Sequence, residues 1–543
     1  MQKKRILCAG APGTGIRDSV AASETAAVRP LNIGWGTAGI VMEKNEMAPI
    51  SGQFYLRLSQ GEMDPVGVTA LVVDNGDDTV IFAALDVVGV RDGLLDRVRG
   101  ELRRRNPEIP VEKIILNATH THSSLGTGFR KGDFPEMDVI ASTEKIVDFL
   151  ARKTVAAIET AWNSRQPGAI AYGYGYATVG FSRRTVYFDD YGKRGQKSGN
   201  VTGFFVNGHA VMYGNTNDTQ FSHYEAGTES FANFLYTFDP AGKLTGAIVN
   251  IPCPSQNSGH EWRLSADYWA DVREAVCREF GDIHILPQCA AAGDLSPRQL
   301  HYLDAEKRRL KLKYAADLKR FETDYVNLLW PGDANAARNL AIERARRRDI
   351  AERIVAAMKE VYAWAKTDRR DRVELKHMIV TMNLPRRTVT QAEYDFEKAN
   401  LAELMKKPFV TEGTWYERAN ANSMLASQRN RCRTVMARYE AQQKNPDYAT
   451  EVHVVKLGDI AFATNQFELF MDYMHRIQAR SPFEQTFIVQ LAGTPGEEGG
   501  TYLPTERAAK NLGYSASVYD SLVSPAGGQQ LVDETVKILQ SIH

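Results

Sequence analysis

The stretch that decides the fold is VEKIILNATHTHSS, residues 111–124, in which a short apolar run passes directly into a polar segment. Ile114, Ile115 and Leu116 have the length and the side chains of a buried strand. Just before them, residues 92–105 place leucines and a valine at helical spacing, which predicts an amphipathic helix. Strand, polar loop and helix in alternation are typical of layered α/β proteins.

The same alternation continues along the chain. Residues 68–90 form two apolar runs joined by Asn-Gly-Asp-Asp, which is a strong hairpin signal. Further helices are predicted at residues 143–162, 267–280, 423–443 and 529–542, strands at 244–251, 284–288 and 373–384, and a second hairpin at 451–465. We therefore expect one large α/β (α+β) catalytic domain of layered mixed sheets and helices, covering residues 1–543.

The middle of the sequence has a different character. Residues 303–321 and 336–366 are rich in Ala, Arg, Lys and Glu, with apolar residues at helical spacing. This predicts a charged helical insertion within the domain at about residues 300–375. The basic run at 344–348 is interleaved with Glu343, Asp349 and Glu352, so we interpret it as a solvated helix face and not as a nucleic-acid patch.

The composition excludes several classes of protein. The 543 residues hold 66 Lys and Arg against 66 Asp and Glu, which argues against a protein that mainly binds nucleic acid or an anionic membrane. Hydrophobic residues are 43% and charged residues 24%, so a wholly disordered or collagen-like chain is excluded. No apolar stretch approaches the roughly 20 residues of a transmembrane helix. Five scattered cysteines do not make a disulfide scaffold.

The first residues leave the compartment open. MQKKRILC, residues 1–8, has a basic start but too few apolar residues for the core of a secretory signal. A cytoplasmic protein and a secreted or periplasmic protein whose signal peptide has been removed both fit. The oligomeric state is equally undetermined by the sequence.

The polar segment after the first strand carries two histidines, His120 and His122. In an extended chain, residues i and i+2 point to the same side, and neutral imidazole is a common zinc ligand. The alternative is that both histidines only satisfy backbone groups of a loop. Two histidines at the end of a strand favour a metal or catalytic site over that alternative.

A second candidate site is QCAAAGDLSP, residues 288–297, which also follows a predicted strand. Its small residues leave space around the hydroxyl of Ser296 for a substrate and for oxyanion-stabilising N–H groups. The competing interpretation is a helix N-cap serine followed by proline at the first helical position. From the residues alone, that second interpretation is the better supported.

Together, the two motifs resemble those of the neutral (non-lysosomal, alkaline) ceramidase family. Four further stretches resemble family segments in the same order along the chain: residues 33–38 with Gly52 and Arg57, the Phe-Ser-Arg-Arg sequence at 181–184, residues 465–477 with Glu468, and residues 500–505 with Tyr502. The resemblance implies the fold of the ceramidase catalytic domain and a metal-dependent amidohydrolase.

The resemblance also implies roles for individual residues. One Zn²⁺ per chain would be held by His120, Glu468 and Tyr502, with His122 beside it. Ser296 would attack the amide carbonyl and Arg183 would orient the substrate. Spacing alone nominates neither Tyr502, which would otherwise be a core aromatic, nor Glu468, which would otherwise be a solvated helix charge.

The sequence departs from the family at one ligand. Where ceramidases have another zinc histidine, this chain has Cys253, in IVNIPCPSQ. A thiolate is a competent zinc ligand, so Cys253 is predicted as the fourth metal ligand. A buried structural cysteine is the alternative. His260, Glu261 and Asp267 are nearby substitutes.

The end of the chain is the second departure. About 40 residues follow Tyr502, so we expect that the family's C-terminal immunoglobulin-like domain is absent. Without a recognisable apolar groove for a two-chain lipid, a small-molecule N-acyl substrate that is smaller or more polar than ceramide fits at least as well as ceramide itself. The alternatives are an esterase, lactonase or carbohydrate-directed hydrolase that uses metal-bound water, or a metal-free binding protein.

Overall fold

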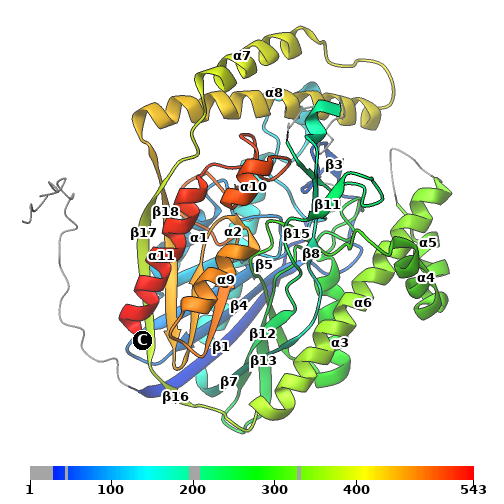
Figure 1. The fold of residues 1–543 in the computed structure, drawn as a ribbon. Helices are drawn as coiled ribbons and strands as arrows, with labels where there is room; N and C mark the ends of the chain where they lie inside the picture. Colours follow the sequence, from blue (N-terminus) through cyan, green and yellow to red (C-terminus); the bar gives the residue numbers. More distant parts are fainter. Residues whose placement is uncertain (1–27, 43–46, 195–207, 327–331, 500) are drawn as a thin grey trace, which may run out of the picture.

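Two facing β-sheets form the centre of the molecule in a computed structural model that describes residues 28–42, 47–194, 208–326, 332–499 and 501–543 (Figure 1). The larger sheet is mostly antiparallel, with parallel pairs at both ends. Its strands, in spatial order, are β14 (His284–Cys289), β13 (Leu244–Ile251), β12 (Phe231–Phe238), β7 (Gln166–Tyr176), β1 (Arg29–Gly39), β4 (Gly67–Asp74), β5 (Thr79–Leu85) and β6 (Ile114–Ala118), with β16 (Arg372–Val373) beside β1. The smaller sheet has the order β17 (Leu375–Pro385), β18 (Asp447–Leu457), β19 (Ile460–Thr464) and β21 (Gln485–Val489).

Helices cover the outer faces of these sheets (Figure 1). The core helices are α1 (Leu94–Arg105), α2 (Thr143–Asn163), α3 (Tyr268–Phe280), α6 (Ala334–Ala365), α9 (Met471–Arg480) and α11 (Pro525–Ile542). Helices α1, α2, α3 and α6 pack on the larger sheet, whereas α9 and α11 pack on the smaller one. The layers therefore run helix, sheet, sheet, helix, and the prediction of an α/β protein with layered mixed sheets is confirmed.

The alternation of side chains along the strands explains the layers. In β4 and β5, Leu71 and Phe82 point toward the other sheet, while Val72 and Ile81 point toward the helices. Both faces are apolar because both are covered, as expected for the central sheet of a layered fold. Between the sheets, the ring of Phe462 lies 4.9 Å from that of Phe82 and 4.5 Å from that of Phe487.

Short strands and further helices complete the fold. The short strands are β2 (Pro49–Ile50), β3 (Arg57–Leu58), β8 (Phe181–Ser182), β9 (Arg184–Tyr187), β10 (Ala210–Met212), β11 (Phe221–Tyr224), β15 (Leu295–Ser296), β20 (Glu468–Leu469) and β22 (Tyr502–Leu503). The remaining α-helices are α4 (Leu303–Lys313), α5 (Ala315–Thr323), α7 (Gln391–Lys406), α8 (Trp415–Lys444) and α10 (Glu506–Asn511). Helices α7 and α8 pack on each other across one end of the molecule (top of Figure 1).

Most predicted elements are present, with a few differences at their ends. The hairpin signal at residues 75–78 joins β4 to β5, and α1, α2 and α3 begin within two residues of their predicted starts. The predicted helix at 303–321 is two helices, because the chain breaks at Tyr314. The sequence reasoning missed α7, which begins with a capping box formed by Thr390 and Glu393.

The basic run on α6 differs from its prediction as a solvated face. Arg346 and Arg347 are buried, 6% and 4% exposed. Arg346 pairs with Glu306 through two contacts of 2.9 Å, and Arg347 pairs with Asp64 and Asp271 at 2.8 Å each. The error arises because periodicity does not reveal that acidic residues of other elements face this side of the helix.

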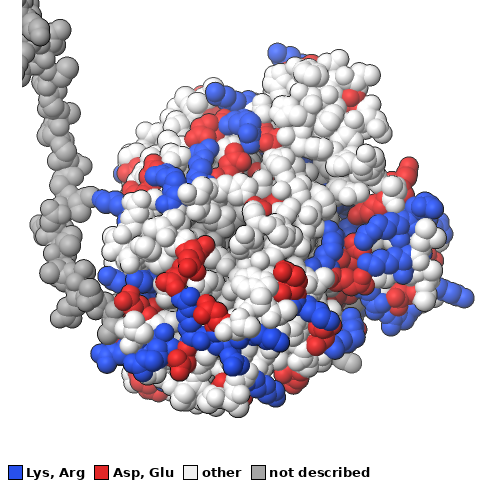
Figure 2. Space-filling model, turned by 60° about the horizontal axis from the view of Figure 1, so that its bottom comes forward, with Lys and Arg blue, Asp and Glu red and all other residues white. Residues whose placement is uncertain are grey.

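The surface carries charges of both signs. On the face that Figure 2 presents, Lys and Arg side chains are interspersed with Asp and Glu. Among the described residues, no helix combines the length and the apolar character required to cross a membrane. The predictions made for residues 1–8, including Cys8, lie outside the described part of the chain.

Candidate functional site

The two histidines that follow β6 lie side by side in the interior. The Nε2 atoms of His120 and His122 are 3.3 Å apart, and their ring centroids are 4.9 Å apart. The sequence argument assumed an extended chain, but this assumption is wrong because His120 has a φ of +62°. This left-handed conformation is uncommon for a residue other than glycine, and such residues cluster at functional sites.

The His120 ring is held in one orientation. Its Nδ1 lies 2.6 Å from the carbonyl oxygen of Val88, so this nitrogen carries the proton and donates it. Nε2 is then left with a lone pair that faces His122 and, at 3.4 Å, the Oε2 of Glu468. A histidine whose other ring nitrogen donates to a carbonyl is the usual arrangement for a metal ligand.

Glu468 and Tyr502 are brought together by strand pairing. They are register partners in the parallel pair of β20 and β22, although 34 positions separate them in the sequence. Glu468 lies on this short strand and not on a helix, and its side chain is 15% exposed. The interpretation of Glu468 as a solvated helix charge is therefore wrong.

Two glycines permit the close approach of these segments. A Cβ on Gly293 would lie 2.2 Å from the carbonyl oxygen of Glu468. A Cβ on Gly52, whose φ is +101°, would lie 2.5 Å from the side chain of His122. Neither position tolerates a larger residue without movement of the backbone of the site.

The hydroxyl of Ser296 lies on the edge of the same site. Ser296 belongs to β15, whose partner in register is Phe181 of β8. Its Oγ accepts the backbone N–H of Arg298 at 3.1 Å and the hydroxyl of Tyr213 at 3.3 Å. The interpretation as an N-cap is wrong, because the next helix, α4, begins only at Leu303.

Arg183 follows β8 directly and points toward the tyrosine. Its guanidinium donates to the carbonyl oxygen of Gly293 at 2.7 Å and lies 5.2 Å from the ring centroid of Tyr502. The Nε of Arg183 is buried and has no hydrogen-bond partner within the described chain. A buried donor without a partner suits an acceptor supplied by a substrate.

The protonation of the site follows from burial and neighbouring charge. Burial, together with the neighbouring His120 and Arg57, lowers the pKa of His122 well below its usual value, so this imidazole is neutral. Burial opposes ionisation of Glu468, but His120 and Arg183 outweigh it and lower its pKa. Burial raises the pKa of Tyr502 well above its usual value, against the effect of Arg183.

A buried arginine holds the loop that carries His122. Arg57 donates to the carbonyl oxygens of His122 and Ser51, both at 2.5 Å, and to that of Glu261 at 2.6 Å. It is fully buried, and burial lowers its pKa to about 10. In the sequence, Arg57 is only one residue of a stretch that resembles a family segment; in the structure, it connects three backbone segments of the site.

Cys253 lies apart from this cluster. Its Sγ contacts the carbonyl oxygens of Val179 and Pro254 at 3.7 and 3.6 Å, within the apolar core beside the larger sheet. Burial raises the pKa of the thiol well above its usual value, which disfavours the thiolate that a metal requires.

The substitutes for Cys253 have different surroundings. The carboxylate of Asp267 accepts the N–H groups of Ser258 and Tyr268, at 2.6 and 2.8 Å, so it acts as a helix N-cap. Glu261 pairs with Arg263 at 3.0 Å. His260 lines the same pocket as Ser296, which leaves it as the substitute that faces the reaction centre.

Three side chains whose arrangement is most like that of a metal centre form a row: His122, His120 and Glu468. Two donors on one zinc ion, each about 2.1 Å from it, stand about 3.4 Å apart in a tetrahedral site. The contact between His120 and Glu468, 3.4 Å, matches that spacing, and a contact of 3.3 Å places His122 beside this pair. The row is not a closed cage, and the described residues contain no group of three or more His, Cys, Asp and Glu side chains that by itself forms a metal site. The donor chemistry fits zinc, with Tyr502 as the additional donor.

Two pockets meet at this row. One, of about 260 Å³, reaches Ser296, Arg183 and His260. The other, of about 330 Å³, reaches His120, Glu468 and the side of α8 that carries Asn430. Residues 52–54, His122, Tyr502 and Tyr514 line both, so His122 is accessible from two sides.

Comparison with known proteins places this geometry in context. Neither a protein-family description nor a curated protein sequence matches the chain. Among solved structures, it is similar to the neutral ceramidase from Pseudomonas aeruginosa, with a TM-score of 0.60 and 18% identity over 94% of this chain and 75% of that one. A ceramidase complexed with C2 is similar at a TM-score of 0.58 and 16% identity, over 94% and 76% of the two chains.

The chain has the neutral ceramidase fold. The resemblance that the sequence motifs indicated is thereby confirmed at the level of the fold. Within this ceramidase fold, the structure brings His120, His122, Glu468, Tyr502, Arg183 and Ser296 around two adjoining pockets, and it leaves Cys253 in the core.

Sequence reasoning missed the residues that complete the pocket of this ceramidase fold. Tyr213 donates to Ser296 and accepts from the amide of Gln256 at 3.3 Å, and the ring of Tyr514 packs edge-on against that of Tyr502 at 5.6 Å. They come from loops between short strands and helices, where periodicity carries no signal. Only the folded chain places them together.

Proposed function

We propose that the protein is a zinc-dependent hydrolase that cleaves an N-acyl (amide) bond of a small molecule, with Ser296 as the nucleophile. The observation that carries the proposal is the His122–His120–Glu468 row, which adjoins the pocket of Ser296 on a ceramidase fold. The two-sided access to His122 suits a substrate that extends in both directions from its scissile bond.

His120, Glu468 and Tyr502 would hold the zinc ion, with His122 beside them. The bound metal would polarise a carbonyl group and lower the pKa of an adjacent hydroxyl. Tyr502 would have to ionise on binding, and the nearby guanidinium of Arg183 favours that ionisation. Of the predicted ligands, Cys253 has the surroundings that are least suited to metal binding. We therefore expect Cys253→Ser to retain zinc.

The residues of the chain would carry the bond changes. The unpartnered Nε–H of Arg183 would donate to the substrate carbonyl and orient it. Ser296 Oγ would attack the carbonyl carbon while neutral His122 accepts the hydroxyl proton. His122 would then pass that proton to the departing amine nitrogen as the C–N bond breaks. Water would finally hydrolyse the acyl-serine ester to a carboxylic acid and free Ser296.

One observation favours a second function. No hydrogen bond links Ser296 to His122 within the described chain, and the Ser296 hydroxyl is instead held by Tyr213 and the backbone of Arg298. A hydrolase of esters, lactones or glycosides that activates water directly would not need that link. A metal-free binding protein is the third possibility.

Metal analysis combined with the Ser296→Ala variant distinguishes these functions. We expect about one zinc per purified chain, hydrolysis of N-acyl compounds, and loss of turnover by at least about 1000-fold in Ser296→Ala with its zinc retained. Near-normal turnover by that variant would favour direct activation of water. Protein that binds no zinc and hydrolyses none of a panel of amides and esters would favour the binding protein.

A further inference from the structure

A second cavity adjoins the pocket of Ser296 and is built largely by the helical insertion. Its volume is about 470 Å³, and it shares two lining residues, His260 and Arg298, with the reaction pocket. Helices α4 and α6 supply most of the remaining wall, including apolar Leu303, Leu340 and Ile342. We call it the insertion pocket. A substrate that reaches past Ser296 toward Arg298 would enter it.

Arg298 stands at the junction of the two pockets. Its backbone N–H binds Ser296 Oγ at 3.1 Å, so its position is fixed relative to the reacting hydroxyl. The side chain of Arg298 is 43% exposed, and its guanidinium donates one hydrogen bond, of 3.0 Å, to Glu343. An arginine has five N–H donors, and within the described chain the others of this guanidinium have no partner.

The charges around the junction leave an excess of positive charge. Arg346 is balanced by Glu306, whereas Glu343 is the one carboxylate that pairs with Arg298 among the described residues. Burial raises the pKa of Glu343 to about 7, against the effects of Arg298 and Arg346, so this carboxyl is partly neutral near pH 7. Lys307 adds a further cation to the lining.

We infer that the insertion pocket binds the amine portion of the substrate and that this portion carries a carboxylate, as in an N-acylated amino acid. The carboxylate would pair with Arg298, which accepts planar anions in a two-point geometry. An apolar side chain would lie along Leu340 and Ile342. This inference rests on the proposed function for the position of the scissile bond, but it is a separate statement about binding.

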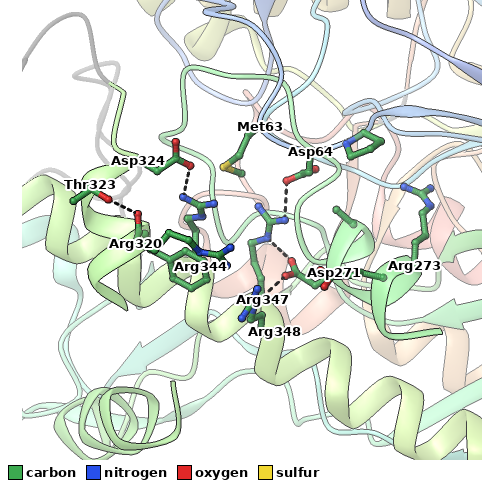
Figure 3. A pocket seen from close by; sticks show the side chains of 14 residues that line it. Met63, Asp64, Asp271, Arg273, Arg320, Thr323, Asp324, Arg344, Arg347 and Arg348 are labelled. Carbon is green, nitrogen blue, oxygen red and sulfur yellow. Dashed lines mark hydrogen bonds and ion pairs between the residues drawn. The ribbon is translucent and has the colours of Figure 1, made fainter. Parts of the chain in front are cut away.

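A larger cavity elsewhere in the described chain offers no comparable anion site. It has a volume of about 810 Å³, and Figure 3 shows three of its arginines, Arg344, Arg347 and Arg348, directed at carboxylates. Arg347 contacts Asp64 and Asp271, and Arg344 contacts Asp324 at 2.9 Å. Carboxylates already neutralise these cations. A substrate anion would therefore be attracted less strongly there than at Arg298.

Equilibrium binding to a full-length Ser296→Ala protein tests the inference. The probes are N-octanoyl-leucine and its uncharged carboxamide, N-octanoyl-leucinamide, measured by titration calorimetry. We expect the carboxylate to bind at least tenfold more tightly, and Arg298→Met in the same background to reduce that preference to less than twofold. Arg298→Lys should keep an intermediate preference. Arg308→Met, at an exposed arginine of α4 that lines neither pocket, is the matched control and should keep the full preference.

The outcomes separate the two proposals. Equal binding of the two probes, binding of neither, or an unchanged preference in Arg298→Met would overturn the carboxylate site. If wild-type protein hydrolyses uncharged N-acyl amides as well as N-acyl amino acids, the proposed function stands and the inference fails. If the carboxylate preference is found but neither compound is hydrolysed, the site stands and the proposed function fails.

Discussion

The row of His122, His120 and Glu468 and the cluster around Arg347 both bury ionisable groups, but they use them differently. Arg347 donates to Asp64, Asp271 and the hydroxyl of Ser265, and its positive charge is balanced. In the row, His120 keeps a lone pair that faces other potential metal ligands, and Arg183 nearby keeps an unpartnered buried N–H.

This difference separates a structural cluster from a candidate reaction centre. Buried polar groups that satisfy one another hold elements together, and the Arg347 cluster joins α6 to α3 and to the loop of Asp64. Buried polar groups that remain unsatisfied are retained at a cost in stability, which is expected where a ligand supplies the missing partner. Substitutions in the row should therefore affect metal and activity, and substitutions in the cluster should affect stability.

The largest effect is expected for His120→Ala. Removing Nε2 should eliminate zinc binding and lower kcat/KM more than about 100-fold, since the remaining donors would hold the metal weakly. Metal content and turnover measure this directly. His223→Ala, at an exposed histidine of β11, is the control. Full zinc occupancy in His120→Ala would show that His120 is not a ligand.

Arg347→Met should show the opposite behaviour. Two half-buried carboxylates would lose their buried cation, so the free energy of unfolding should fall by about 3 kcal/mol. The kcat/KM of the folded variant should change less than tenfold. Urea denaturation gives the stability, and Arg348→Met, whose more exposed side chain also contacts Asp271, should cost about 1 kcal/mol or less. A loss of activity without a loss of stability would contradict the assignment of this cluster.

Gly293→Ala tests how tightly the reaction centre is packed. The new Cβ would collide with the carbonyl oxygen of Glu468, so the backbone must shift at a cost of about 1–3 kcal/mol, and zinc affinity should fall with it. Gly39→Ala is the control, because no atom lies within 4 Å of its Cβ position. Unchanged zinc affinity in Gly293→Ala would mean that the Glu468 segment adapts freely.

The smallest effect concerns pH. Burial raises the pKa of Asp271 above its ordinary value of 3.8, while Arg347 opposes this. Without Arg347, the pKa of Asp271 in the folded state rises further. At a pH between the unfolded-state and folded-state pKa values of Asp271, the folded state binds one more proton than the unfolded state. The loss of unfolding free energy caused by Arg347→Met should therefore become smaller, by about 1 kcal/mol, as the pH falls from 8 to 5. A deficit that is independent of pH would show that Asp271 is neutralised in another way.

Local patterns were sufficient to predict most of the regular structure. The apolar runs of β5, β6 and β13 and the turn at residues 75–78 depend on neighbouring residues, so they can be recognised without the fold. The basic run of α6 could not be interpreted in this way. Whether Arg347 faces solvent or a carboxylate depends on Asp64, which is 283 positions away.

The residues of the candidate site also divide into those that a short sequence motif reveals and those that only the fold brings together. His120, His122 and Ser296 were recognised because each follows a strand within one short motif. Glu468 and Tyr502 could be named only through the resemblance to ceramidases, since their contact is made by the pairing of β20 with β22. The contacts of Tyr213 and Arg298 with Ser296 had no sequence signal at all.

The sequence by itself determined the layered α/β class, the strands that carry the two motifs, and the residue types able to bind zinc or act as a nucleophile. Those properties depend on local periodicity and on side-chain chemistry. Only the tertiary structure decided that Cys253 lies in the apolar core, that His120 has a left-handed backbone conformation, and that helices α4 and α6 line a cavity next to the pocket of Ser296. These outcomes depend on which distant segments meet, and that is set by how the whole chain packs.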